Sequence, residues 1–339
     1  MKTNTHLKLR VSISFAISIF VLCCGLAFSA SDPKAPLLTP LSSSGLSLNP
    51  AAKSIPVILD TDIGTDIDDA FALALALTSP EIELRGVTTV SSDAYTRALI
   101  VCRFLHTVGR GDIPVAAGRP KRSEPERNGQ YLYGLEGNFP NRPVDESAAE
   151  FLFRMLKAEP GKITIVTVGD LTNIGRLLTD HPEVKPWIRR IVIMGGAVRV
   201  GYNSQPPAVW EWNIRSDIRA AQVVFSSGIP LLVAPLDATM VRLEEPMRGQ
   251  IFTAGTRLSS ELQTLYKLWG KSTPVLFDPV ALTLSFRETF CIMENLRLEV
   301  DSEGVTQEIS GSPNAKVAMS IRKEDFLQWY VDRICSSPR

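Results

Sequence analysis

The sequence predicts an α/β fold: a doubly wound, mainly parallel sheet with antiparallel additions near the C-terminus. From Ile55 onward, short and nearly continuous apolar runs alternate with amphipathic stretches. Such runs are typical of strands that helices cover on both faces. Their βαβα order favours parallel pairing in a doubly wound arrangement. With 339 residues, 45% of them hydrophobic, the chain is long enough for one large domain.

Each apolar run and amphipathic stretch predicts one element. The predicted strands are residues 56–59, 82–90, 163–168, 191–194 and 230–234. The predicted helices are residues 68–78, 94–108, 147–157, 171–178 and 216–226. Near the C-terminus, residues 296–300, 305–309 and 316–320 alternate in polarity between Gly and Pro signals, so we expect antiparallel strands there, followed by a helix over about 323–334.

The N-terminus predicts export. Lys2, Lys8 and Arg10 precede an uncharged stretch that ends in small residues near position 30, as in a secretory signal over residues 1–30. Residues 31–53 are rich in Ser, Pro and Leu and indicate a flexible leader before a catalytic domain at 54–339. We therefore expect a periplasmic or secreted protein that does not associate with a membrane after signal removal. If the segment is retained, it is long enough to act as a membrane anchor.

Charge and cysteine content exclude some classes of partner and site. Lys plus Arg and Asp plus Glu are equal at 36 each, so no net field attracts nucleic acid or an anionic membrane. Without the signal, the cysteines are Cys102, Cys291 and Cys335, an odd number without the short spacing of a zinc site.

An aspartate cluster directly follows the first predicted strand, where doubly wound sheets bind their ligands. Its members are Asp60, Asp62, Asp66, Asp68 and Asp69. Repulsion among so many carboxylates is costly unless a cation neutralises them or some are protonated. Oxygen ligands in this number favour Ca²⁺ or Mg²⁺. Capping of the following helix is the alternative, but it explains one or two acids rather than five.

Two enzyme classes begin with such a motif. In a haloacid-dehalogenase-type phosphatase, Asp60 would be the nucleophile, but the downstream Lys and acidic pair of that class are not obvious here. The chain resembles the nucleoside hydrolase family more closely, through Asp68-Asp69 and the apolar run after them. The resemblance continues through VTTV at 87–90, PVAAG at 114–118, LTNI at 171–174, IMGG at 193–196, EWN at 211–213 and DP at 278–279.

The resemblance implies the nucleoside hydrolase fold and calcium-dependent hydrolysis of the N-glycosidic bond of ribonucleosides, releasing base and ribose. By position, Asp62 would bridge Ca²⁺ and the attacking water. Asp69, Asp278 and the backbone carbonyl of Val168 would complete the metal site, and Asp68 would contact the ribose hydroxyls. Asp60 would be a supporting acid.

Asp66 has no assigned role. Two more residues separate Asp62 from the acid pair than in the shortest family pattern, so Asp66 could take over one of these roles.

The resemblance also implies a set of ribose contacts: Met194, Asn203, Glu211 and Asn213. Met194 could instead be strand core, and Asn203 a turn residue. Glu211 and Asn213 alternate with two tryptophans and would share one side of an extended segment.

The leaving-group side departs from the family's pattern. Members of broad or pyrimidine specificity carry a His where this chain has Phe277, and many members carry an Asn where it has Asp93. Both changes resemble the purine-preferring branch, in which aromatic rings sandwich the base. Phe277, with Tyr131 or Tyr133 from a Gly-rich loop at 129–137, would stack on a purine, although these rings could equally be loop anchors.

Three functions therefore stay open: the hydrolase, the phosphatase, and a ribose-binding or nucleoside-binding protein that has lost turnover. For the hydrolase we expect a small-molecule nucleoside as partner and a homo-oligomer, either a dimer or a tetramer.

Overall fold

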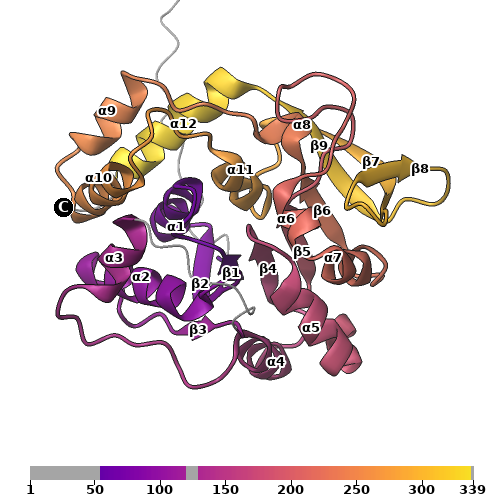
Figure 1. Cartoon of the computed structure of the whole chain (residues 1–339), viewed down its shortest axis with the longest axis horizontal. Coiled ribbons are helices and arrows are strands. Elements are labelled where there is room, and N and C mark those ends of the chain that lie inside the picture. Colours follow the sequence, from indigo (N-terminus) through magenta and orange to yellow (C-terminus); the bar gives the residue numbers. More distant parts are fainter. Residues whose placement is uncertain (1–53, 120–128, 337–339) are drawn as a thin grey trace, which may run out of the picture. The chain divides into compact units, whose positions relative to one another are not determined.

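A nine-stranded sheet runs through the computed structural model, which describes residues 54–119 and 129–336 (Figure 1). The strands are β1 (Ile55–Thr61), β2 (Ile82–Thr89), β3 (Val115–Ala117), β4 (Thr164–Thr167), β5 (Arg190–Met194), β6 (Leu231–Ala234), β7 (Cys291–Val300), β8 (Thr306–Ile309) and β9 (Ala315–Ile321). Their order is β3-β2-β1-β4-β5-β6-β9-β7-β8. All neighbours from β3 to β9 are parallel, and β7 is antiparallel to β9 and β8. The predicted fold class is confirmed.

The antiparallel strands near the C-terminus are confirmed, but one pairing was not predicted. Strand β9, over the predicted residues 316–320, is antiparallel to β7 and also lies parallel beside β6. The chain passes β6, forms β7 and β8, and then returns to fill the gap beside β6. A polarity pattern indicates a strand but not its neighbours, so only the tertiary structure decides this pairing.

Helices cover both faces of the sheet. They are α1 (Asp68–Thr78), α2 (Ala94–Thr107), α3 (Gly129–Leu135), α4 (Ala148–Ala158), α5 (Thr172–Asp180), α6 (Trp212–Ser216), α7 (Ile218–Phe225), α8 (Leu236–Thr239), α9 (Met247–Phe252), α10 (Arg257–Trp269), α11 (Phe277–Leu284) and α12 (Lys323–Cys335), with a 3-10 helix at Pro182–Trp187. In β1, Val57 and Leu59 pack with α1, α2 and α11, whereas Ile58 packs with α4 and α5 on the other face. Two cores therefore explain the continuous apolar runs.

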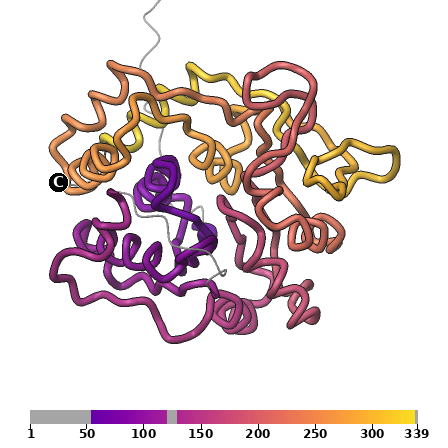
Figure 2. Tube along the Cα trace, viewed as in Figure 1, coloured from indigo at the N-terminus to yellow at the C-terminus, as the bar shows by residue number. Residues whose placement is uncertain are grey.

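The first helix, α1, is buried on all sides. Its residues from Ala70 to Leu75 are fully buried, and it packs against α10, α11 and α12. Figure 2 shows the C-terminal α12 beside α1, although the two are far apart in the sequence. The Tyr330 hydroxyl donates a hydrogen bond to the Phe71 carbonyl oxygen at 3.0 Å. Because the helix is buried from Asp68 to Ala76, the acidic residues at its N-terminus are buried with it.

The predicted Gly-rich loop at 129–137 was wrong in its first part, because residues 129–135 form α3. Tyr131 and Tyr133 are each only 3% exposed, and the Tyr133 hydroxyl donates to Glu261 in α10. Gly134 lies against α2 so closely that a Cβ there would be 2.9 Å from the Ile100 nitrogen. Close helix packing therefore overrides the low helix propensity of glycine.

The predicted secretory signal at 1–30 and the predicted leader at 31–53 lie outside the residues that the structure describes. The described residues belong to one compact unit, Pro50–Arg339. Within the described ranges, no helix combines the length and apolar character that crossing a bilayer requires.

Packing between α5 and α7 provides a test of this fold. A Cβ at Gly175 would lie 2.7 Å from the Ala220 Cα, a contact with backbone that cannot move aside easily. Gly175→Ala should therefore lower the free energy of unfolding by about 1–3 kcal/mol, measured by thermal and denaturant unfolding. Gly249→Ala in α9 is the matched control, since its Cβ would meet only the flexible end of Glu245. Equal effects of the two variants would contradict the close α5–α7 contact.

Candidate functional site

A cavity of about 370 Å³ lies at the carboxyl ends of the central strands. Its lining consists of Asp62, Thr65, Asp66, Asp68, Asp69, Val168, Met194, Tyr202, Glu211, Trp212, Asn213, Leu236, Phe277 and Asp278. Nine of the eleven predicted site residues are in this set. The parallel strands bring them together, because β1, β4 and β5 all end at the same edge of the sheet.

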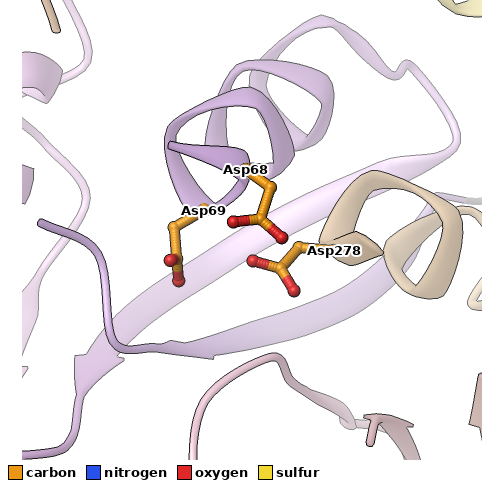
Figure 3. A group of neighbouring side chains, drawn as sticks. All are labelled: Asp68, Asp69 and Asp278. Carbon is orange, nitrogen blue, oxygen red and sulfur yellow. The ribbon is translucent and has the colours of Figure 1, made fainter. Parts of the chain in front are cut away.

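Three buried carboxylates meet on one side of the cavity (Figure 3). Asp68 and Asp69 come from the N-terminus of α1, and Asp278 from the first turn of α11. One oxygen from each of the three lies within 4.8 Å of the others. The structure thus places Asp68, predicted as a ribose contact, within 4.8 Å of Asp278, as it does the predicted metal ligand Asp69. Asp62 lines the same cavity without belonging to this trio.

Burial makes the charged form of these acids costly. Burial is the first cause that raises the pKa of Asp68, Asp69 and Asp278 well above the usual range, and their mutual repulsion adds to it. Burial likewise raises the pKa of Asp62 to about 6, although the positive charge of Arg97 opposes the shift. A divalent cation among these oxygens would remove both penalties. The donor set is entirely oxygen and fits such an ion.

Asp60 lies beneath the cavity rather than in its lining. It is fully buried and accepts hydrogen bonds from Thr88 at 2.5 Å, Asn173 at 2.7 Å and Thr167 at 3.3 Å. Burial is the main cause that raises its pKa to about 7, and these hydrogen bonds oppose the shift. A carboxylate that is enclosed and fully hydrogen-bonded is poorly placed to attack a phosphate ester. This geometry disfavours the phosphatase alternative.

The segment of Glu211 and Asn213 differs from our prediction. Rather than one extended segment, Glu211 is the N-cap residue of α6, and its carboxylate accepts from the backbone nitrogens of Gly196, Asn213 and Ile214 at 2.9–3.1 Å. Helical spacing replaces alternation here, because the carboxylate satisfies the free amides of the first turn. Both side chains are nevertheless buried in the cavity wall.

Asn213 connects two strand ends beneath the cavity. Its side-chain nitrogen donates to the carbonyl oxygens of Val168 at 2.9 Å and Met194 at 3.2 Å, and lies 3.4 Å from the Met194 sulfur. The carbonyl predicted as a metal ligand is therefore fixed by a residue predicted as a ribose contact. A carbonyl oxygen has two lone pairs, so this hydrogen bond leaves one for a cation.

Two predicted substrate contacts are not in the cavity lining. The Asp93 carboxylate caps α2, accepting from the Thr96 nitrogen at 3.1 Å and the Thr96 hydroxyl at 2.6 Å. Asn203 is exposed and accepts from the Gln205 nitrogen at 3.0 Å, as a turn residue does. The neighbouring Tyr202 lies in the lining instead, and its hydroxyl accepts from the Trp212 nitrogen at 2.9 Å.

Thr65, Tyr202, Trp212 and Leu236 also belong to the lining, although their sequence context did not indicate it. Trp212 was noticeable only as a neighbour of two predicted contacts. The direction of Tyr202 depends on an irregular loop, for which the sequence carries no periodic signal.

An aromatic ring, Phe277, and no histidine are among the described lining residues. Phe277 begins α11 beside Asp278 and is partly buried. His181 lies elsewhere, stacked on Phe153 with 4.1 Å between ring centroids, and His106 is exposed near the end of α2. Tyr131 and Tyr133, which we expected to stack on a base, pack between helices rather than line the cavity.

Comparisons with known proteins agree on one family. The family model described as inosine-uridine preferring nucleoside hydrolase matches residues 57–328. The pyrimidine-specific ribonucleoside hydrolase RihA of Salmonella arizonae is 33% identical over 319 residues, covering 83% of this chain and 98% of the relative. RihA of Escherichia coli is 32% identical over 312 residues, with the same coverage.

Solved structures give the same result. A plant nucleoside hydrolase superposes with a TM-score of 0.74 at 25% identity, covering 84% of this chain and all of that one. A purine-preferring ribonucleoside hydrolase from Gardnerella vaginalis superposes with a TM-score of 0.72 at 26% identity, covering 83% and 98%. The matched region contains every residue of the cavity lining. The chain therefore belongs to the inosine-uridine preferring nucleoside hydrolase family, a family of metal-dependent ribonucleoside hydrolases.

Proposed function

We propose that this protein hydrolyses the N-glycosidic bond of ribonucleosides with the help of a bound calcium ion, releasing base and ribose. One observation carries the proposal: three buried carboxylates meet in a cavity that Asp62, Glu211 and Asn213 also line. Because the three carboxylates repel one another, a cation bound between them would be stabilised. Glu211 and Asn213 would provide hydrogen-bond partners for a sugar.

Calcium suits the donor set better than magnesium does. Several carboxylates and the Val168 carbonyl surround one side of the cavity. Calcium accepts many oxygen ligands in flexible geometry, whereas magnesium demands near-ideal octahedral geometry and usually keeps several waters. A divalent ion held here lowers the pKa of a nearby water molecule and so makes it a better nucleophile.

Asp62 is the group we propose to accept the proton of that water. Asp62 is partly buried and lies in the cavity lining together with the trio. A carboxylate within hydrogen-bond reach of a water molecule can accept its proton as a general base. The buried negative charges around it would also favour the positive charge that develops on the ribose.

The ribose would lie between Asp68 on one side and Met194, Glu211 and Asn213 on the other. The Glu211 carboxylate already accepts three backbone hydrogen bonds, and burial raises its pKa. We therefore assign Glu211 chiefly to fixing the wall, and Asp68 to the ribose hydroxyls.

For the base, we propose a preference for purines. Phe277 offers a ring face beside Asp278, and the larger purine ring gains more from stacking. Relatives of both named specificities resemble the chain: RihA, 33% identical, is named pyrimidine-specific, and the Gardnerella vaginalis enzyme, 26% identical, purine-preferring. The proposal therefore rests on Phe277 and the absence of histidine from the described lining.

We further propose that the protein is exported through its N-terminal signal and acts as a homo-oligomer, a dimer or a tetramer. The charge pattern of residues 1–30 supports export. Protease accessibility in intact cells and light scattering of the purified protein would test these two proposals.

Metal removal tests the proposed reaction directly. Purified protein should release base and ribose from inosine, guanosine, adenosine, uridine or cytidine in the presence of Ca²⁺, and chelator should abolish the release, because the carboxylate cluster then has no counter-charge. Chromatography of the free base and a reducing-sugar assay measure it. Tight nucleoside binding without turnover would favour the binding-protein alternative, and phosphate release from phosphomonoesters the phosphatase.

The Asp62 assignment is tested against Asp66. Asp62→Ala should lower kcat by about 100- to 10,000-fold, the usual contribution of a general base. Asp66→Ala should have a much smaller effect. The Asp66 carboxylate accepts a hydrogen bond from the backbone nitrogen of the adjacent Ile67 at 2.8 Å, and Asp66 is not a member of the trio. Steady-state kinetics with Asp62→Asn as an isosteric control measures both. The opposite ranking would show that Asp66 has taken over the role given to Asp62.

The purine preference is tested at Phe277. Phe277→Leu retains an apolar side chain but removes the ring face, so KM for inosine and guanosine should rise by roughly 2- to 10-fold, the factor that corresponds to one aromatic contact. KM for uridine should change less. Phe286→Leu, which alters a ring packed against Trp329 outside the cavity, is the control. A larger KM change for uridine than for inosine would contradict the preference.

A further inference from the structure

The β1–α1 loop, residues 62–67, includes Asp62 and Asp66. Two buried polar side chains donate hydrogen bonds to this loop from the side away from the cavity. Arg97 of α2 is 2% exposed, and Gln130 of α3 is fully buried. Neither belongs to the described cavity lining, whereas Asp62, Thr65 and Asp66 of the loop do. The loop therefore presents side chains to the cavity on one side and backbone to α2 and α3 on the other.

The hydrogen bonds from these two side chains reach the peptide carbonyls of Asp62, Ile63, Thr65 and Asp66. The Arg97 guanidinium donates to the carbonyl oxygen of Asp62, to that of Ile63 at 2.9 Å and to the Thr65 hydroxyl at 2.8 Å. Gln130 donates to the carbonyl oxygens of Asp66 at 3.1 Å and Thr65 at 3.5 Å. A planar guanidinium with several donors in fixed directions suits such a set of acceptors, which the single ammonium of lysine cannot reproduce.

Close packing fixes the loop further. Gly64 has a φ of +112°, and a Cβ at this position would lie 2.7 Å from the Ile100 side chain in α2. The loop thus turns at its glycine directly against α2. The loop begins at Asp62, directly after β1, and leads into α1 at Asp68. Its shape therefore determines the position of Asp62 relative to Asp68 and Asp69.

We propose that Arg97, assisted by Gln130, is a positioning residue that sets the distance and direction of Asp62 relative to Asp68 and Asp69. This inference rests on the proposed function, since it assigns Arg97 to the geometry of the cation site and of the water-activating base. Arg97 lies outside the described cavity lining, so its loss should affect calcium binding and kcat rather than nucleoside KM.

Arg97→Lys tests the inference while keeping the positive charge. Calcium affinity should fall by about 10- to 100-fold, the range seen when groups that orient metal ligands are changed. Under saturating calcium, kcat should fall as well, with KM for inosine little changed. Calorimetric titration of the metal-free protein with calcium alone, steady-state kinetics, and hydrogen–deuterium exchange of residues 62–67 measure the three effects.

Arg103→Lys on the same helix is the matched control. Arg103 also donates to two carbonyl oxygens, those of Tyr133 and Glu136, each at 2.7 Å, but it does not contact the β1–α1 loop. It should retain calcium affinity, kcat and the exchange rate of residues 62–67.

A lower melting temperature in Arg97→Lys with wild-type calcium affinity and kcat would overturn the inference, because Arg97 would then only stabilise the fold. If this variant does not fold, Gln130→Leu carries the same test: calcium affinity should fall, and wild-type affinity would overturn the proposal. Failure of the wild type to bind calcium or cleave nucleosides would instead refute the proposed function. Exchange of residues 62–67 would still report whether Arg97 fixes the loop.

Discussion

Repulsion among carboxylates held away from water is the constraint on which the site depends. Asp68, Asp69 and Asp278 share a small volume with little solvent, and Asp62 lies in the same cavity. Such an arrangement is unfavourable for the bare protein, because both burial and like charge raise the pKa of each acid. The surrounding fold has to hold these groups together against that force. The rigid elements that do so are the buried helix α1, the first turn of α11 and the ends of β1 and β4.

The support extends at least one layer below the cavity. Asp60 joins Thr88, Thr167 and Asn173, which come from β2, β4 and α5, and so ties neighbouring strand ends together. Asn213 similarly joins the ends of β4 and β5 through the carbonyls of Val168 and Met194. Polar groups that are buried and fully hydrogen-bonded rigidify a site in this way. Several residues that look like substrate contacts in the sequence therefore act at least partly on the protein itself.

The two halves of the cavity differ in the residues that line them. The acidic half is formed by Asp62, Asp68, Asp69 and Asp278, next to the β1–α1 loop that Arg97 and Gln130 hold. The rest of the lining includes Phe277, Tyr202 and Trp212, and no histidine is among the described lining residues. The class of reaction is therefore easier to infer from these residues than the base that the protein prefers. Stacking surfaces accept several bases, whereas a carboxylate cluster has few functions other than binding a cation.

The sequence by itself determined the fold class, most elements around the sheet, and the members of the acidic cluster, because hydrophobic period and local composition are properties of neighbouring residues. It also indicated Phe277 and Asp278, through the resemblance to the family. Only the tertiary structure decided that β9 inserts beside β6, that Tyr131 and Tyr133 are interior, and that Asp93 and Asn203 serve a helix cap and a turn. It alone revealed the contacts of Arg97. These outcomes depend on which surfaces meet across long sequence separations, and a buried arginine has no local pattern that distinguishes it from an exposed one.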